Sequence, residues 1–93
     1  MKFLFSKVKF KRNETDNRLV AEGEITNNSG RSYNTVVFRL VVFVREIPIG
    51  NITFSIKNFR VGQTRNFAKE VEELDYNMIS KITRYEVFTE SAY

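Results

Sequence analysis

The stretch EITNNSGRSYNTVVFRLVVFV, residues 24–44, joins a cluster of turn-forming residues to a long apolar segment. Asn and Gly tolerate the positive φ angles that tight reversals require, so residues 27–30 predict a turn. The segment 36–44 after it is rich in β-branched side chains, which fit a pleated strand better than a helix. The stretch therefore predicts a tight turn followed by one long strand of an all-β fold.

This long strand is apolar on both of its faces. One face carries Val37, Val41 and Phe43, interrupted only by Arg39. Such a strand is either covered on both sides by its own chain, here by residues 72–81, or it lends its second face to a partner. The second alternative predicts a protein interface at Val37, Val41 and Phe43. The opposite face, which we expect in the hydrophobic core, carries Phe38, Leu40, Val42 and Val44.

The rest of the chain supplies further short strands between turn signals. Polar and apolar side chains alternate along residues 6–12, 18–26 and 52–57, as in half-buried strands. Gly23, inside the second of these segments, predicts a bulge or a close approach by a neighbouring strand. Residues 72–81 fit a helical turn or a crossing loop equally well. The pattern predicts an antiparallel β-sandwich of about seven strands.

Composition bounds the size and the chemistry of the molecule. A chain of 93 residues closes one hydrophobic core, so we expect a single domain over residues 1–93. Neither cysteine nor histidine occurs, which removes most zinc sites and the Ser-His and Cys-His nucleophilic pairs. We therefore expect no enzyme, with no catalytic residue, no cofactor and no metal site.

Two groups of acidic residues are candidates for catalysis or for binding a cation, and the sequence pattern favours neither role. Glu22 and Glu24 share one predicted strand face, about 7 Å apart by strand geometry, in the range of paired catalytic carboxylates. A solvated strand face accounts for them equally well. The later group lacks the ordered spacing of a calcium loop and consists of Glu70, Glu72, Glu73 and Asp75.

Basic residues gather near the start of the chain, whose net charge is +4. Basic strands interleaved with aromatic rings bind single-stranded nucleic acids through phosphate contacts and base stacking. Against this reading, Val8 and Phe10 lie on the opposite strand face from the lysines. Single-stranded nucleic-acid binding is therefore the alternative function. Its candidate surface consists of Lys7, Lys9, Lys11, Arg12 and Arg39, with Phe3, Phe5 and Phe43 as aromatic members.

The sequence shows no targeting or membrane segment. The opening residues begin like a signal peptide, but Ser6 and Lys7 end the apolar run too early. No stretch reaches the roughly 18 apolar residues of a membrane span. The compartment stays open, and a cell-surface location follows only if the domain was excised from an exported protein.

The order of these features resembles the FxLYD-type domains, a family of small prokaryotic β-sandwich modules. The resemblance covers roughly residues 20–68, and the sequence departs from the family pattern at Val44-Arg45, where an aromatic-Asp pair is usual. It implies an immunoglobulin-like sandwich that acts as a non-catalytic protein-interaction or accessory module, with a protein partner or a second copy. The matching positions are Gly23, Ile25, the turn Asn27-Asn28-Ser29-Gly30, Phe38, Leu40, Gly50, Phe59, Val61-Gly62-Gln63 and Phe67.

Overall fold

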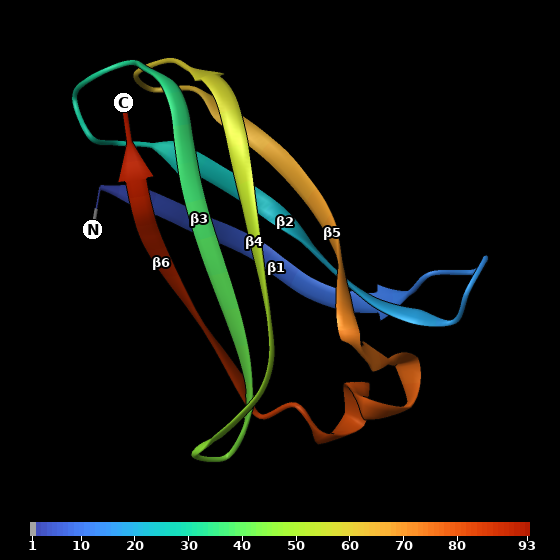
Figure 1. Ribbon diagram of the computed structural model, residues 1–93. Coiled ribbons are helices and arrows are strands. Elements are labelled where there is room, and N and C mark those ends of the chain that lie inside the picture. Colours follow the sequence, from blue (N-terminus) through green and yellow to red (C-terminus); the bar gives the residue numbers. More distant parts are fainter. Residues whose placement is uncertain (1) are drawn as a thin grey trace.

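Two three-stranded antiparallel sheets pack face to face around one hydrophobic core (Figure 1). The computed structural model describes the backbone of residues 2–93 and the side chains of residues 2–71, 74 and 77–93. One sheet has the strand order β1-β2-β5 and the other has the order β4-β3-β6. The elements are β1 (Phe3–Arg12), β2 (Arg18–Asn27), β3 (Tyr33–Val44), β4 (Ile47–Phe59), β5 (Thr64–Asp75), the 3-10 helix η1 (Tyr76–Lys81) and β6 (Arg84–Ala92).

The prediction of a single all-β domain built as a sandwich is confirmed, with six strands in residues 2–93 where about seven were predicted. Residues 72–81, predicted as a helical turn or a crossing loop, complete β5 and then form the helical turn η1. Met78 and Ile79 of η1 pack against the core, and η1 lies against β1, β2 and β5. Residues 72–81 therefore do not provide the predicted cover for the second face of β3. Within the described residues, no helix has the length and apolar character needed to cross a bilayer.

Strand β3 is the centre of its sheet and supplies much of the core. It pairs with β4 on one side and with β6 on the other. Val36, Phe38, Leu40 and Val42 are fully buried, as the alternation predicts, while Val44 at the strand end is half-buried. Each fully buried side chain of this size stabilises the fold by roughly 1.5–3 kcal/mol relative to an exposed one.

A cluster of aromatic rings joins the two sheets. The ring centroid of Phe38 lies 5.3 Å from those of Phe3 and Phe5 of β1, and both contacts are edge-to-face. On the other sheet edge, Phe54 stacks on Phe67 with centroids 5.0 Å apart. Such ring pairs add about 0.5–1.5 kcal/mol beyond the area that they bury. The phenylalanines thus hold β1 and β5 of one sheet against β3 and β4 of the other.

A β-bulge in β1 lies opposite Gly23 of β2. Lys7 and Val8 together oppose this single glycine, and Lys7 has a φ of 54°. A Cβ atom on Gly23 would lie 3.1 Å from the carbonyl oxygen of Ser6 and 3.1 Å from the Cα of Val8. The prediction of a bulge or a close approach at Gly23 is confirmed in both forms, since the missing side chain is what lets the bulged backbone come so near.

The bulge shifts the alternation of β1 by one residue. Without it, Phe3 and Phe5 would share a face with the lysines that follow them, as period two requires. Phe3 is instead 4% exposed, and Phe5, Val8 and Phe10 all pack against the core. One strand therefore presents apolar side chains inward both before and after the bulge.

Buried Asn27 organises the turn that begins with it. Its Nδ2 donates hydrogen bonds to the carbonyl oxygens of Arg31 at 2.8 Å and Phe59 at 3.2 Å. Its Oδ1 accepts from the backbone N–H of Ser29 at 3.0 Å and from the Ser29 hydroxyl at 2.6 Å. Gly30 has a φ of 85°, which agrees with the predicted tight reversal. This one amide ties the end of β2, the turn and the end of β4 together.

The substitution Gly23→Ala should lower the free energy of unfolding by about 1–3 kcal/mol, because the new methyl group would press on backbone atoms that cannot rotate away. Urea denaturation measures the loss. Gly50→Ala is the matched control, since the three atoms nearest to its methyl group would belong to the side chains of Leu74 and Val71 and not to the backbone. A Gly23→Ala variant as stable as the wild type would contradict the close approach.

The substitution Asn27→Ala should lower the free energy of unfolding by about 2–4 kcal/mol, because buried carbonyl groups lose their donors. The neighbouring variant Asn28→Ala changes an exposed side chain and should stay within about 0.5 kcal/mol of the wild type. Thermal and urea unfolding measure both. Equal effects at the two positions would show that the Asn27 amide does not hold the turn.

Candidate interaction surface

The outer face of the β4-β3-β6 sheet carries the residues predicted as a protein interface. Val37, Val41 and Phe43 alternate with the fully buried core residues of β3 and so point away from the core. Val41 is 6% exposed, whereas Val37 and Phe43 are half-buried. The predicted residues therefore share one face, and Val41 at its centre is covered by neighbouring side chains of its own chain.

The flanking strands complete this face with different chemistry on each side. Strand β4 places polar side chains opposite β3: Ser55 pairs with Val37, and Thr53 with Arg39. Strand β6 adds an apolar ring, since Phe88 pairs with Arg39 and is 39% exposed. Phe88 is not among the residues that the sequence predicts for this surface. The alternation of residues 84–90, with Tyr85 and Val87 on one face, was the signal that would have placed Phe88 on the other.

Two arginines lie over the aromatic rings of the outer face. The Cζ of Arg39 is 4.8 Å from the ring centroid of Phe88, and its Nε donates to Glu90 Oε1 at 2.5 Å. The Cζ of Arg84 is 3.8 Å from the ring centroid of Phe43. A guanidinium over an aromatic ring is attracted by the negative face of the ring.

Carboxylates hold these arginines in place. Glu90 pairs with Arg39, and Arg84 pairs with Glu86 next to it on β6 and with Glu46, where Nη2 and Oε2 are 3.9 Å apart. Exposed pairs of this kind contribute at most about 1 kcal/mol each. Their effect is to order the long side chains, so that the outer face of this sheet is an arrangement of rings, guanidinium groups and carboxylates.

The candidate nucleic-acid residues divide between two sheets. The lysines belong to β1 of one sheet, with Arg12 at the end of that strand, and Arg39 belongs to β3 of the other. The outer faces of the two sheets point in opposite directions, so Arg39 does not join the β1 residues. Phe3 and Phe5 are also not on the lysine surface, because the bulge turns them into the core. The prediction of aromatic rings among these lysines is wrong for both residues.

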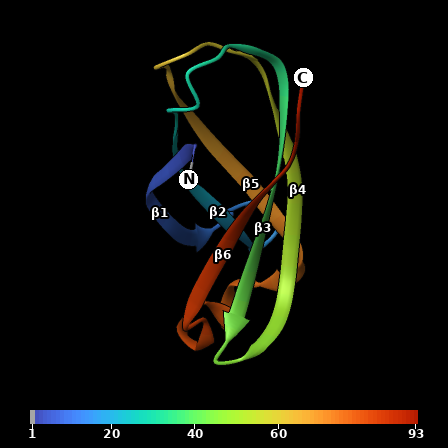
Figure 2. The same ribbon diagram turned by 90° about the vertical axis from the view of Figure 1, so that its left-hand side faces the viewer.

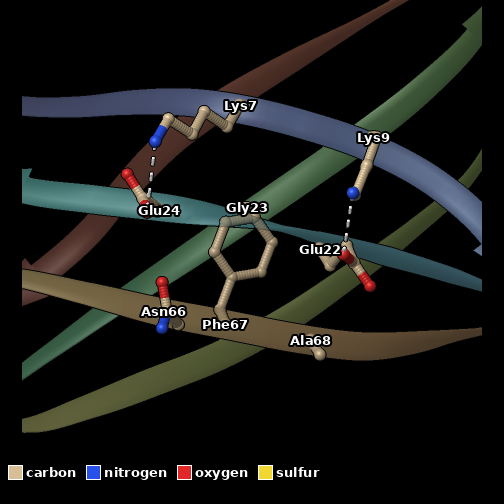
Figure 3. A pocket seen from close by; sticks show the side chains of 8 residues that line it. All are labelled: Lys7, Lys9, Glu22, Gly23, Glu24, Asn66, Phe67 and Ala68. Atoms are coloured by element: carbon tan, nitrogen blue, oxygen red, sulfur yellow. Dashed lines mark ion pairs between the residues drawn. The ribbon is translucent and has the colours of Figure 1, made fainter.

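The lysines of β1 are paired with the carboxylates of β2 (Figure 3). The Nζ of Lys7 is 3.8 Å from Glu24 Oε2, and that of Lys9 is 3.6 Å from Glu22 Oε2. Lys11 approaches the other oxygen of Glu22 to 2.7 Å. A phosphate group brought to these lysines would therefore meet two carboxylates at the same place.

An open depression of about 550 Å³ lies on this surface, above the backbone of Gly23. Lys7, Lys9, Glu22 and Glu24 stand around it, and Asn66 and Ala68 border it on β5 (Figure 3). The two positive charges and the two negative charges around the depression balance each other. The arrangement offers neither an excess of positive charge for an anion nor an unpaired carboxylate for a cation.

Glu22 is a carboxylate whose pKa is lowered. A hydrogen bond from Lys11 holds its pKa below the ordinary value of 4.5, the charges of Lys11 and Lys9 act in the same direction, and partial desolvation opposes them. Glu22 is thus ionised near neutral pH and is not suited to donate a proton as a general acid. Glu22 and Glu24 are therefore the acidic members of an ion-pair network with the lysines of β1.

The acidic group at residues 70–75 lies in part outside the described side chains. Glu70 accepts a hydrogen bond from Asn13 Nδ2 at 2.8 Å, while the side chains of Glu72, Glu73 and Asp75 are not among those described. Among the side chains that are described, no three acidic groups are arranged to hold a metal ion.

No protein family, curated protein or solved structure matches this chain. The resemblance to the FxLYD-type domains therefore stays a prediction, and the functional proposal rests on the two outer faces.

The substitution Lys11→Ala should raise the pKa of Glu22 toward its ordinary value, because it removes the hydrogen bond that contributes most to the shift. A carboxyl pKa lowered by folding stabilises the fold above the unfolded pKa, and this contribution is lost as the pH falls through the folded pKa. Carbon-detected NMR titration of Glu22 measures the shift, with Lys81→Ala as the control at an exposed lysine of η1. An unchanged Glu22 pKa in Lys11→Ala would contradict the assignment.

Proposed function

We propose that the domain is a non-catalytic protein-interaction module of prokaryotic type, which binds a partner through the outer face of the β4-β3-β6 sheet. We also propose that its sandwich is immunoglobulin-like, as the resemblance to FxLYD-type domains implies. The observation that supports the binding proposal is the pairing of the Phe43 and Phe88 rings with the guanidinium groups of Arg84 and Arg39 on this face.

The composition of this face supports the proposal. Arginine and aromatic side chains are enriched in the centres of protein interfaces, where they lose water on binding and carry much of the affinity. Phe88 is 39% exposed, and Val37 and Phe43 are half-buried beside it. The polar side chains of Thr53 and Ser55 on β4 form a rim of the kind that surrounds such centres.

The alternative, single-stranded nucleic-acid binding, has the lysine row of β1 as its support. Each of Lys7, Lys9 and Lys11 is within ion-pair distance of Glu22 or Glu24. Phosphate contacts would have to compete with these pairs, and among the described side chains no exposed aromatic ring lies beside the lysines, since the nearby Phe67 is buried. The proposed protein-binding function is therefore better supported than the alternative.

Site-specific photo-crosslinking in the cells of origin tests the proposed function. A benzophenone amino acid replaces Thr53 on the proposed surface, and in a matched variant it replaces Ala68, which is also exposed in mid-strand but lies on the outer face of the other sheet. We expect a discrete protein adduct from position 53 and none from position 68. The adduct should weaken severalfold when Phe88→Ser is added, because that change removes the exposed ring.

Adducts of equal yield at both positions would contradict the proposed surface, and so would an adduct at position 53 that Phe88→Ser leaves unchanged. Titration with labelled single-stranded oligonucleotides at two salt concentrations tests the alternative on the same samples. Salt-sensitive binding that is lost in Lys7→Ala would favour the alternative, because phosphate contacts weaken as salt rises.

A further inference from the structure

We propose that the free edge of β6 pairs with β6 of a second copy of this chain, antiparallel and centred on Val87, to form a six-stranded sheet across a two-fold dimer. The proposal goes beyond the proposed function because the contact is made by the backbone edge of the sheet, although the charged side chains that set its register stand on the outer face. It does not depend on the partner that the outer face binds.

Strand β6 is an open edge. In the part of the chain that the structure describes, β3 is the strand that pairs with it, and the other side of β6 carries no strand. Figure 2 looks onto this side of the molecule, with β6 crossing in front of β3. Alternate N–H and C=O groups of an edge strand point outward and can pair with another strand.

The other strand edges are obstructed. Strand β1 carries the bulge at Lys7 and three exposed lysines, both of which discourage edge-to-edge pairing. Strand β4 contains Pro48, and the guanidinium of Arg65 on β5 donates to the carbonyl oxygen of Lys57 at 3.0 Å. The edges of β4 and β5 are therefore bridged to each other.

The stretch 84–89 of β6 lacks these protections. It contains no proline, glycine or lysine, and its pairing with β3 is regular up to Thr89, after which Glu90 is bulged. An edge of this kind offers a regular row of backbone groups to an antiparallel strand. Its length is close to that of an ordinary strand pairing.

The charges along β6 are complementary to those of β6 in a second copy. When two copies pair antiparallel about Val87, Glu86 lies opposite Phe88, and Arg84 of each copy comes beside Glu90 of the other, just beyond the regular stretch. Within each copy, Arg84 also pairs with Glu86 and Glu90 pairs with Arg39, so the contact between copies would join these pairs into one network. The pair of opposite charges occurs twice because the dimer is two-fold symmetric. Opposite charges directly across two strands stabilise the pairing, and like charges destabilise it.

The same charges disfavour the neighbouring registers. Centring the pairing on Glu86 brings the Glu86 carboxylates of the two copies opposite each other. Centring it on Phe88 brings Glu86 of each copy opposite Glu90 of the other. A shift by a single residue would bring the core face of one strand against the outer face of the other. The register about Val87 is therefore the one that the side chains of β6 select.

The inner side of the same edge is apolar and open. The rings of Tyr85 and Phe10 meet edge-to-face with centroids 6.2 Å apart, and Tyr85 is 37% exposed. Beside them is a hollow of about 380 Å³ whose lining includes Ile79 and Ile82. A strand added to β6 would extend over this hollow and remove the Tyr85 ring from water, which favours the association.

Charge-reversal variants of the full chain test the proposal by sedimentation equilibrium from micromolar to millimolar concentration. Arg84→Glu and Glu90→Arg should each weaken the dimer by roughly tenfold or more, since each turns two attractive pairs into two repulsive ones. An equimolar mixture of the two variants should regain the wild-type association, because both cross-strand pairs are then attractive. Lys69→Glu, an exposed charge reversal on β5, should dimerise as the wild type does.

Hydrogen exchange of the wild-type chain is the second measurement and needs no variant. Alternate amides of residues 84–89 should exchange more slowly as the concentration rises, while the amides of β1 do not change. A chain that stays monomeric at millimolar concentration overturns the proposal, and so does a dimer that the charge-reversal mixture fails to restore. Neither result alters the adduct expected at position 53, so failure of the dimer and failure of the proposed function remain distinguishable.

Discussion

The β-bulge at Lys7 and Val8 decides which side chains of β1 enter the core and which ones lie on the outer face of its sheet. It brings Phe3 and Phe5 against Phe38, so the aromatic cluster joins the two sheets. It also leaves the lysines on the solvent side, where the carboxylates of β2 meet them. The bulge is possible because position 23 has no side chain.

The two outer faces differ in the kind of cation that they carry. Lysine ammonium groups are compact and strongly hydrated, and on the β1-β2-β5 sheet they meet carboxylates in water. Guanidinium groups are planar and weakly hydrated, so Arg39 and Arg84 can lie over Phe88 and Phe43. Water is more easily displaced from the second surface, and for this reason we propose that surface for a protein partner.

The long strand could be predicted because local and tertiary preferences agree there. Asn27 and Gly30 specify the turn through side-chain hydrogen bonds and a positive φ, and Phe38, Leu40 and Val42 alternate into the core. The candidate surface could be predicted only in its β3 part.

The inward face of β1 and the β6 part of the candidate surface could not be predicted, because they depend on how strands pair, and the sequence of one strand does not specify its pairing. The phase of β1 changes at a bulge that Gly23 alone suggested, and Phe88 joins Arg39 only through the pairing of β6 with β3. Residues 72–81 fitted a helical turn and a crossing loop equally well for a related reason, because their conformation depends on the packing of Met78 and Ile79 against the core.

The position of β6 in the chain has a consequence for biosynthesis. Strand β3 acquires β4 within a hairpin as soon as residues 47–59 follow it, but its other neighbour, β6, is the last of the six described strands to be made. Until then the β3 segment, with its run of valines, presents an unpaired apolar edge, the kind of segment that nucleates aggregation between nascent chains. Arg39 interrupts that run with a charge, and so acts as a gatekeeper during translation before it has Glu90 to bind.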